Sequence, residues 1–253
     1  MSQIRYSNEN FPPVIKNLLI INVLVYVAQL TMETQFHLTD KIELHAILPE
    51  NLKRAMAMTG ELSGMTPFNP YQLITYMFAH SPDNIGHILF NMFALWMFGR
   101  ILENLWGAKR FLFFYLASGV GAALLHLAIQ YLRARQVVDG LSPEQILQAA
   151  GGSEAFKINI SKAILSAVGA SGAIMGIMAA FGYLFPNTEL MIIPIPVPVK
   201  AKWLVLGYIG LDLFGGISNS TGDNVAHFAH LGGALVGFII VFIWNKTNRK
   251  SLY

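Results

Sequence analysis

The chain has 253 residues, no cysteine, 54% hydrophobic residues and only 12% charged residues. Soluble domains carry roughly 25% charged residues, so this composition excludes an ordinary soluble domain, a disordered chain and a disulfide-stabilised scaffold. The formal net charge is +3, but the basic residues are scattered in ones and twos between apolar runs. Nucleic-acid binding needs clustered basic residues, so no nucleic-acid partner is expected. The composition predicts a polytopic membrane protein within a lipid bilayer.

Six apolar segments, separated by charged residues, are candidate transmembrane helices. An unpaired charge in the middle of a bilayer is costly, so charged residues mark where spans end. The predicted spans are residues 14–31, 84–99, 111–132, 163–185, 203–217 and 225–244. The sequence therefore predicts an all-α polytopic fold of six transmembrane helices in a single domain, residues 1–253, with outer loops at 32–83 and 133–162.

The distribution of lysine and arginine orients these spans. If the N-terminus is cytoplasmic, the inside segments hold 10 basic and 3 acidic residues, whereas the outside segments hold 7 basic and 11 acidic residues. Cytoplasmic loops of membrane proteins are enriched in lysine and arginine. We therefore predict a multi-pass protein of a bacterial inner (plasma) membrane with both termini in the cytoplasm.

Three connecting segments have local structure of their own. Prolines and polar residues interrupt the segment 61–83, which is expected to form a loop at the membrane surface. Three prolines make the run 192–199 an extended connector. The outer loop 133–162 is predicted to hold a surface helix with a capping box, from Ser142, Pro143, Gln145 and the terminating Gly151.

Polar side chains inside three of the apolar spans mark a candidate site. Ser171 in the fourth span and His230 in the sixth each lie 15 residues before the inner boundary. At 1.5 Å per residue this is about 22 Å, so both lie at one level, roughly 8 Å below the outer surface of a core about 30 Å thick. Asn91 and His87 are four residues apart, on one face of the second span and in the same layer or slightly deeper.

These residue types at one depth suit nucleophilic catalysis. A serine hydroxyl needs a neutral imidazole within hydrogen-bond reach, and His230 is the candidate for Ser171. Small residues allow the two helices to approach, as in Gly172-x-x-x-Gly176 and Gly233-x-x-x-Gly237. Asn91 and His87 can donate to a developing oxyanion. Either residue of the pair alone would more often be an interhelical hydrogen-bond partner, but their coincidence favours catalysis.

In these motifs the chain resembles the rhomboid intramembrane serine proteases, over residues 14–244. The matching segments are Gly169-Ala170-Ser171-Gly172, Ala229-His230-Leu231-Gly232-Gly233 with Gly237, and His87-Ile88-Leu89-Phe90-Asn91. The resemblance implies a serine endopeptidase that cuts single-span membrane proteins near the outer face, with no cofactor and no metal. In it a short fourth span carries Ser171 as the nucleophile, and His230 is the general base and then the general acid. Asn91, His87 and the backbone at Ser171 would stabilise the oxyanion.

Five residues near the proposed site carry further expectations. The family uses no acidic third member, and Asp212 is expected at the outer boundary, away from the dyad. Met175 stands where some members have a tyrosine against the catalytic histidine, so altered packing is expected. Tyr71-Gln72 replaces a frequent Trp-Arg pair in the loop before the second span. His80 is expected to be a solvated side chain at the membrane interface.

Three alternatives belong to other functional classes. A metal-dependent protease or a metal transporter could use His87, His227 and His230, although no His-Glu-x-x-His pattern is present. An intramembrane aspartyl protease would need two buried aspartates on two spans, which the predicted spans do not offer. A rhomboid-like protein could also bind transmembrane helices without cutting them. Such a protein would be expected to lose the serine or the histidine.

Overall fold

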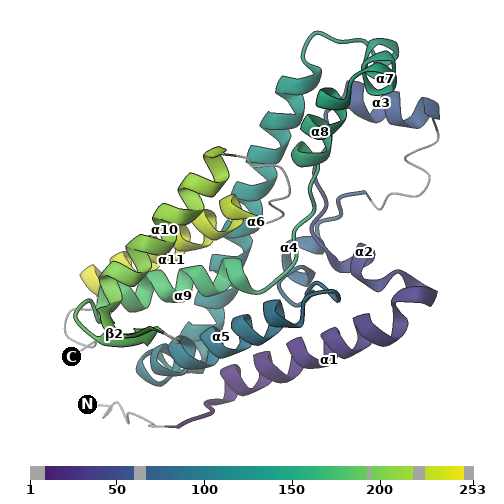
Figure 1. Cartoon of the computed structure of the whole chain (residues 1–253). Coiled ribbons are helices and arrows are strands. Elements are labelled where there is room, and N and C mark those ends of the chain that lie inside the picture. The colour runs from purple at the N-terminus through teal and green to yellow at the C-terminus, as the bar shows by residue number, and fades with distance from the viewer. Residues whose placement is uncertain (1–8, 60–66, 193–194, 219–225, 248–253) are drawn as a thin grey trace.

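The fold is a bundle of helices with one short hairpin, and the computed structural model describes residues 9–59, 67–192, 195–218 and 226–247 (Figure 1). In chain order the elements are α1 (Pro13–Phe36), α2 (Leu38–Ile42), α3 (Glu50–Thr59), α4 (Gln72–Thr75), α5 (Ile85–Trp106), α6 (Ala108–Val138), α7 (Pro143–Gly152), α8 (Glu154–Ala163), α9 (Ser171–Leu184), β1 (Glu189–Ile192), β2 (Ile195–Lys200), α10 (Ala201–Ser218) and α11 (His227–Thr247). The antiparallel pair β1 and β2 lies where an extended connector is expected, so the all-α prediction misses a small hairpin.

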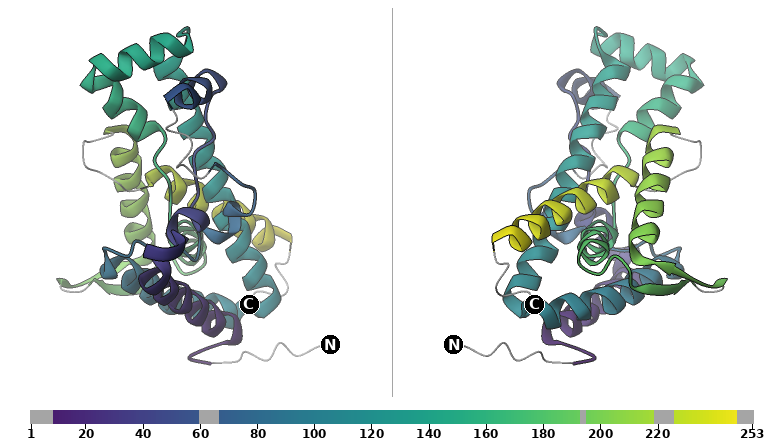
Figure 2. Two further views of the ribbon diagram at one scale, coloured as in Figure 1. Left: turned by 90° about the vertical axis from the view of Figure 1, so that its right-hand side faces the viewer. Right: turned by 90° about the vertical axis from the view of Figure 1, so that its left-hand side faces the viewer.

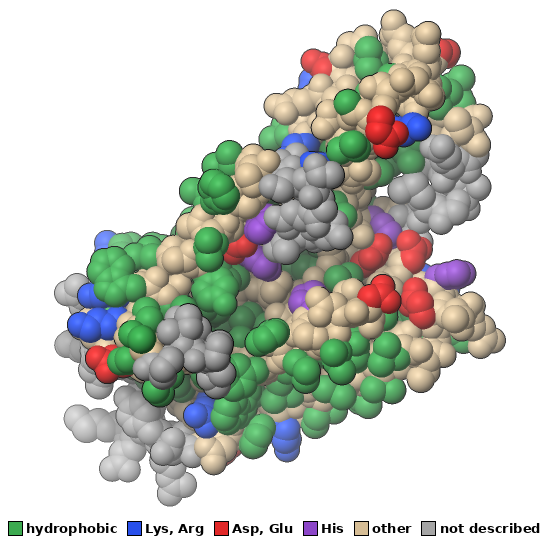
Figure 3. Space-filling view, in the orientation of Figure 1, with side chains coloured by type: hydrophobic (Ala, Val, Ile, Leu, Met, Phe, Trp, Pro, Cys, Tyr) green, Lys and Arg blue, Asp and Glu red, His purple; other side chains and the backbone are tan. Residues whose placement is uncertain are grey.

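Four of the described helices, α1, α5, α6 and α11, are long and apolar enough to cross a membrane. Large hydrophobic side chains are exposed along α1, α10 and α11, and Figure 3 shows hydrophobic side chains spread over the left and lower parts of the molecule. This distribution is typical of lipid-facing helices, and the protein is a multi-pass membrane protein. The prediction of six spans is not confirmed, because α9 has only 14 residues and α10 contains the charged Lys202 and Asp212.

The core of the bundle is α9, which packs against both α6 and α11, and these two helices also pack directly against each other. Figure 1 shows the three helices together. The predicted close crossing of α9 and α11 is confirmed at two glycine pairs. A Cβ on Gly233 would collide with the backbone of Gly172, and one on Gly237 would lie 2.5 Å from Gly176 Cα. Because these glycines have no side chains, the backbones of α9 and α11 come into contact. Side chains on the two helices can then form hydrogen bonds with one another.

The fourth predicted span begins later than expected. Residues 164–170 are not helical, and Leu44 forms an isolated antiparallel bridge with Ala167 before α9 begins at Ser171. Gly169 has a φ of +118°, a conformation that residues with a Cβ rarely adopt. The glycine therefore turns the chain just before α9, and the helix begins at the serine.

The two outer loops fold against each other beyond the far end of α6, which runs six residues past its predicted end at 132. Figures 1 and 2 show α3, α7 and α8 grouped there, away from α9. The capping box predicted at Ser142 and Gln145 is confirmed at the start of α7, and α8 follows it without having been predicted. A small apolar cluster joins the loops through Leu52, Ala55, Met56, Val138 and Ile146.

Two buried polar side chains fix α1 against α5 and the segment before it. The Glu103 carboxylate near the end of α5 accepts hydrogen bonds from the backbone N–H groups of Val14 (2.9 Å) and Ile15 (2.8 Å) at the start of α1. A carboxylate there satisfies free N–H groups and complements the helix dipole. Further along α1, the amide of Gln29 exchanges two hydrogen bonds of 2.9 Å with the backbone of His80. The first contact fixes the C-terminal end of α5, and the second fixes the segment that leads into its N-terminal end.

The glycine crossing gives a first prediction. Gly233→Ala places a methyl group against the backbone of Gly172, and such overpacking costs about 1–3 kcal/mol. Gly207→Ala on α10 is the matched control, because a Cβ there meets nothing within 4 Å. Thermal unfolding of detergent-solubilised protein should show a clear loss for Gly233→Ala and none for Gly207→Ala. Equal midpoints for the two variants would contradict the crossing.

Candidate active site

Ser171 and His230 are in direct contact, although they are 59 residues apart in the chain. The distance between Ser171 Oγ and His230 Nε2 is 2.8 Å. Ser171 is the first residue of α9, and His230 lies in the first turn of α11. The predicted proximity of the two side chains is therefore present, while their catalytic roles remain a prediction.

The backbone around Ser171 is shaped by glycines and by the beginning of α9. The first N–H groups of a helix have no intrahelical acceptor and carry the positive end of the helix dipole. Gly169 donates its N–H to the carbonyl of Tyr76 at 2.9 Å, which ties the turn to the segment after α4. A Cβ on Gly172 would lie 2.6 Å from Ala122 Cβ, so the glycine lets α9 approach α6. The serine thus presents its hydroxyl at a fixed helix start.

Asp212 contacts the histidine of this pair, which corrects the expectation that it lies at the outer boundary. Its side chain is buried in α10, and its Oδ1 and Oδ2 lie 3.0 Å and 3.2 Å from His230 Nδ1. Oδ1 is also 2.8 Å from His227 Nδ1. Because an ionised carboxylate only accepts hydrogen bonds, both imidazoles donate to it through Nδ1. Hydrogen-bond contacts therefore link Ser171 through His230 to Asp212 without a break.

His87 and Asn91 lie beside Gly169, in the turn that precedes Ser171. A Cβ added at Gly169 would be 2.8 Å from His87 Nε2 and 3.4 Å from Asn91 Nδ2. Both side chains come from the first two turns of α5, where Asn84 caps the helix by accepting the N–H of His87. The structure therefore gathers all four predicted site residues around the turn that ends at Ser171.

His80 is fully buried beside this pair, so the prediction of a solvated interfacial side chain is wrong. Its Nε2 lies 3.1 Å from Asn91 Nδ2, and its Nδ1 lies 3.3 Å from the carbonyl of Phe78. A carbonyl only accepts, so Nδ1 carries the proton and Nε2 accepts from the Asn91 amide. Burial, with a smaller effect of the nearby His87, lowers the pKa of His80 to about 4. Neutral His80 therefore accepts a hydrogen bond from one N–H of the Asn91 amide. The second N–H of that amide can donate to a ligand.

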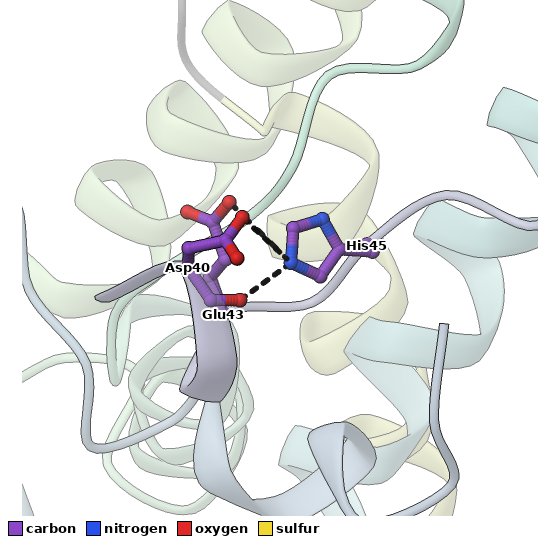
Figure 4. A group of neighbouring side chains, drawn as sticks. All are labelled: Asp40, Glu43 and His45. Atoms are coloured by element: carbon purple, nitrogen blue, oxygen red, sulfur yellow. Dashed lines mark hydrogen bonds and ion pairs between the residues drawn. The ribbon is translucent and has the colours of Figure 1, made fainter. Parts of the chain in front are cut away.

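One cluster in the described part of the chain has the spacing of a metal site. Ligand atoms of Asp40, Glu43 and His45 lie within 4.8 Å of one another (Figure 4). His45 Nε2 is already 2.6 Å from the carbonyl oxygen of Asp40 and forms ion-pair contacts with both carboxylates. These internal contacts hold the three side chains together. In the same described residues, His87, His227 and His230 do not form a group of this kind.

Comparison with known proteins assigns the family. Residues 67–247 match the Rhomboid domain, which is more than half of the chain and includes every residue of the site. The chain belongs to the rhomboid family. It is 28% identical over 229 residues to the rhomboid protease AarA of Providencia stuartii, covering 88% of this chain and 69% of that protein. It is 25% identical to the rhomboid protease GluP of Bacillus subtilis, covering 66% of this chain and 25% of GluP.

The rhomboid relatives also include proteins of organelles. The mitochondrial rhomboid protein 1 of Saccharomyces cerevisiae is 28% identical over 173 residues, which are 68% of this chain and 42% of that protein. The mitochondrial rhomboid-like protein 12 of Arabidopsis thaliana is 32% identical over 169 residues, which are 67% of this chain and 45% of that protein. The chain thus spans less than half the length of these two relatives.

The environment of His80 gives a prediction for stability. Its pKa falls from 6.5 to about 4 on folding, so between these values the unfolded chain binds a proton that the folded chain does not. The contribution of His80 to the free energy of unfolding is therefore complete above pH 6.5. It decreases by about 3 kcal/mol as the pH falls to 4. His80→Gln should flatten this part of the curve of unfolding midpoint against pH. Parallel curves for the variant and the wild type would refute the assignment.

Proposed function

We propose that this rhomboid protein is an intramembrane serine endopeptidase that hydrolyses peptide bonds of single-span membrane proteins near the outer membrane face. The observation that carries the proposal is the 2.8 Å contact between Ser171 Oγ and His230 Nε2 at the start of a buried apolar helix. A hydroxyl and an imidazole in this geometry are what an activated serine nucleophile requires. The protease names of the relatives from Providencia stuartii and Bacillus subtilis support the same reaction.

The proposed reaction has two stages. In the first, Ser171 Oγ bonds to the scissile carbonyl carbon while His230 Nε2 takes the hydroxyl proton, and the same proton then passes to the leaving amine as the C–N bond breaks. In the second, water replaces the amine and gives its proton to His230 as it attacks the acyl carbon. The ester bond to Ser171 breaks, and the serine recovers its proton from His230.

The oxyanion of the tetrahedral intermediate is proposed to face the turn at Gly169. The backbone N–H groups at the start of α9, the second N–H of Asn91 and the His87 imidazole are the available donors around this turn. The bond between Asn91 and His80 holds the amide in place. Donors that are already oriented need no rearrangement when charge develops, which is the condition for electrostatic stabilisation of a transition state.

The same proposal includes the membrane topology. We propose six spans in one rhomboid domain, residues 1–253, with α9 and α10 crossing alongside α1, α5, α6 and α11. A helix of 14 residues is about 21 Å long, less than a core of about 30 Å, so α9 would start below the outer surface and end at the inner one. Both termini would be cytoplasmic, as lysine and arginine placement favours. The proposed membrane is a bacterial inner membrane.

Cleavage of a reporter tests the proposal. Purified protein in liposomes should cut a single-span reporter that carries small residues near the outer end of its helix, and Ser171→Ala should abolish cutting. Ser161→Ala, in the exposed part of α8, is the matched control and should cut as the wild type does. If wild-type protein binds the reporter but leaves it intact, the chain is instead a non-catalytic rhomboid-like protein that captures transmembrane helices.

The oxyanion donors give a separate prediction. Asn91→Ala should lower kcat for the reporter about 10²–10³-fold with little change in KM, because the amide acts mainly on the transition state. Asn187→Ala, at an exposed position beyond the other end of α9, is the control and should leave both constants unchanged. A loss confined to KM would assign Asn91 to substrate binding instead.

A further inference from the structure

We propose that Asp212 is the third member of this site, a positioning residue that orients the His230 imidazole and fixes its tautomer. The inference rests on the proposed serine peptidase activity and adds a carboxylate that a serine–histidine dyad does not require. Asp212 comes from α10, whereas Ser171 and His230 come from α9 and α11. Three helices would therefore have to be in place for the site to be complete.

The position of Asp212 needs an explanation, because a carboxylate within an apolar helix is costly unless it is satisfied. Its side chain is 8% exposed, and it lies six residues inside the C-terminal end of α10. Its oxygens accept from the Nδ1 atoms of two histidines of α11, at 2.8 Å from His227 and 3.0 Å from His230. Of the two rings, His230 also reaches the serine. The buried carboxylate is thus linked directly to the proposed base.

The contact decides which nitrogen of His230 can act as the base. A neutral imidazole carries one proton, on either Nδ1 or Nε2. Asp212 holds this proton on Nδ1, so Nε2 keeps its lone pair and points it at Ser171 Oγ, 2.8 Å away. In the other tautomer Nε2 would already hold a proton and could not accept the one from serine. Asp212 therefore selects the reactive form of the ring.

The surroundings of Asp212 hold it in this position. The His227 ring packs where a Cβ on Gly215 would lie. The histidine therefore packs directly against the backbone of α10, one turn beyond Asp212. Arg133 of α6 donates a 2.6 Å hydrogen bond to the carbonyl of Gly216, in the last turn of α10. Its guanidinium also lies 4.9 Å from the centre of the Phe228 ring of α11. These contacts tie α10 to α6 and α11 one turn beyond the carboxylate.

The proposed role keeps the proton balance of the reaction. When Ser171 Oγ bonds to the carbonyl carbon, its proton moves to His230 Nε2 and the ring becomes a cation. Asp212 stays ionised, still accepting the N–H of Nδ1, and stabilises that cation at hydrogen-bond distance. When the C–N bond breaks, the Nε2 proton goes to the leaving amine. The carboxylate itself gains no proton at any step, so Asp212 is a positioning residue.

The test compares Asp212→Asn with Asp139→Asn, which removes an exposed carboxylate just beyond α6. The probe is a fluorescent fluorophosphonate, whose phosphorus bonds to the serine oxygen as fluoride leaves. Asp212→Asn should lower the second-order labelling rate about 10²-fold or more, because its amide can donate to Nδ1 and favour the wrong tautomer. Asp139→Asn should label as the wild type does. A rate for Asp212→Asn within threefold of the wild type would overturn the proposal.

A second measurement does not depend on the folding of a variant. Nitrogen-15 spectra of histidine-labelled wild-type protein should show His230 protonated on Nδ1, with its signals assigned by their loss in His230→Gln. Protonation on Nε2 in the wild type would overturn the role of Asp212 even if the serine is reactive. Failure of the wild type to label at Ser171 would instead overturn the peptidase proposal, so the two failures are distinguishable. Asp212→Glu should recover part of the labelling rate, because it restores an acceptor.

Discussion

The contact between the backbones of α9 and α11 is the constraint on which the site depends. Gly233 lies against the backbone of Gly172, and Gly237 lies against Gly176 one turn further along. Ser171 directly precedes the first pair on α9, and His230 precedes it by three residues on α11. A larger side chain at the crossing would push the helices apart and lengthen the 2.8 Å contact between hydroxyl and imidazole. The proposed chemistry of this rhomboid protein therefore depends on glycines at the crossing, where no side chain separates the two helices.

Two hydrogen bonds hold the polar side chains on either side of Ser171. Asp212 accepts from the imidazole that faces Ser171, and His80 accepts from the Asn91 amide on the opposite side of the turn at Gly169. The first contact leaves a lone pair on Nε2 of His230 facing Ser171, and the second holds the Asn91 amide beside the turn at Gly169. A buried polar network fixes orientation only when it is fully satisfied. The hydrogen bonds that orient His230 and Asn91 therefore also satisfy the buried Asp212 and His80.

Sequence reasoning recovers the parts of the site that periodicity and depth define, and misses those that depend on tertiary contacts. Ser171 and His230 are equally far from their inner span boundaries, so their meeting could be predicted. The sequence places Asp212 at the outer boundary of a span, because its histidine partners lie on another helix and no local pattern joins them. His80 was expected to be solvated, but Gln29, 51 residues away, pairs with its backbone in the interior. The late start of α9 follows from the turn at Gly169 and from the bridge between Leu44 and Ala167, and the bridge has no signal in the local sequence.

The most direct test of the account is to locate the nucleophile. Protein treated with a fluorophosphonate at neutral pH should be digested and its modified residue identified by mass spectrometry. The account predicts one adduct, on Ser171, which is lost in His230→Ala while the variant remains folded. An adduct on another residue, or one on Ser171 that persists without His230, would contradict the claim that the meeting of α9 and α11 creates a reactive serine.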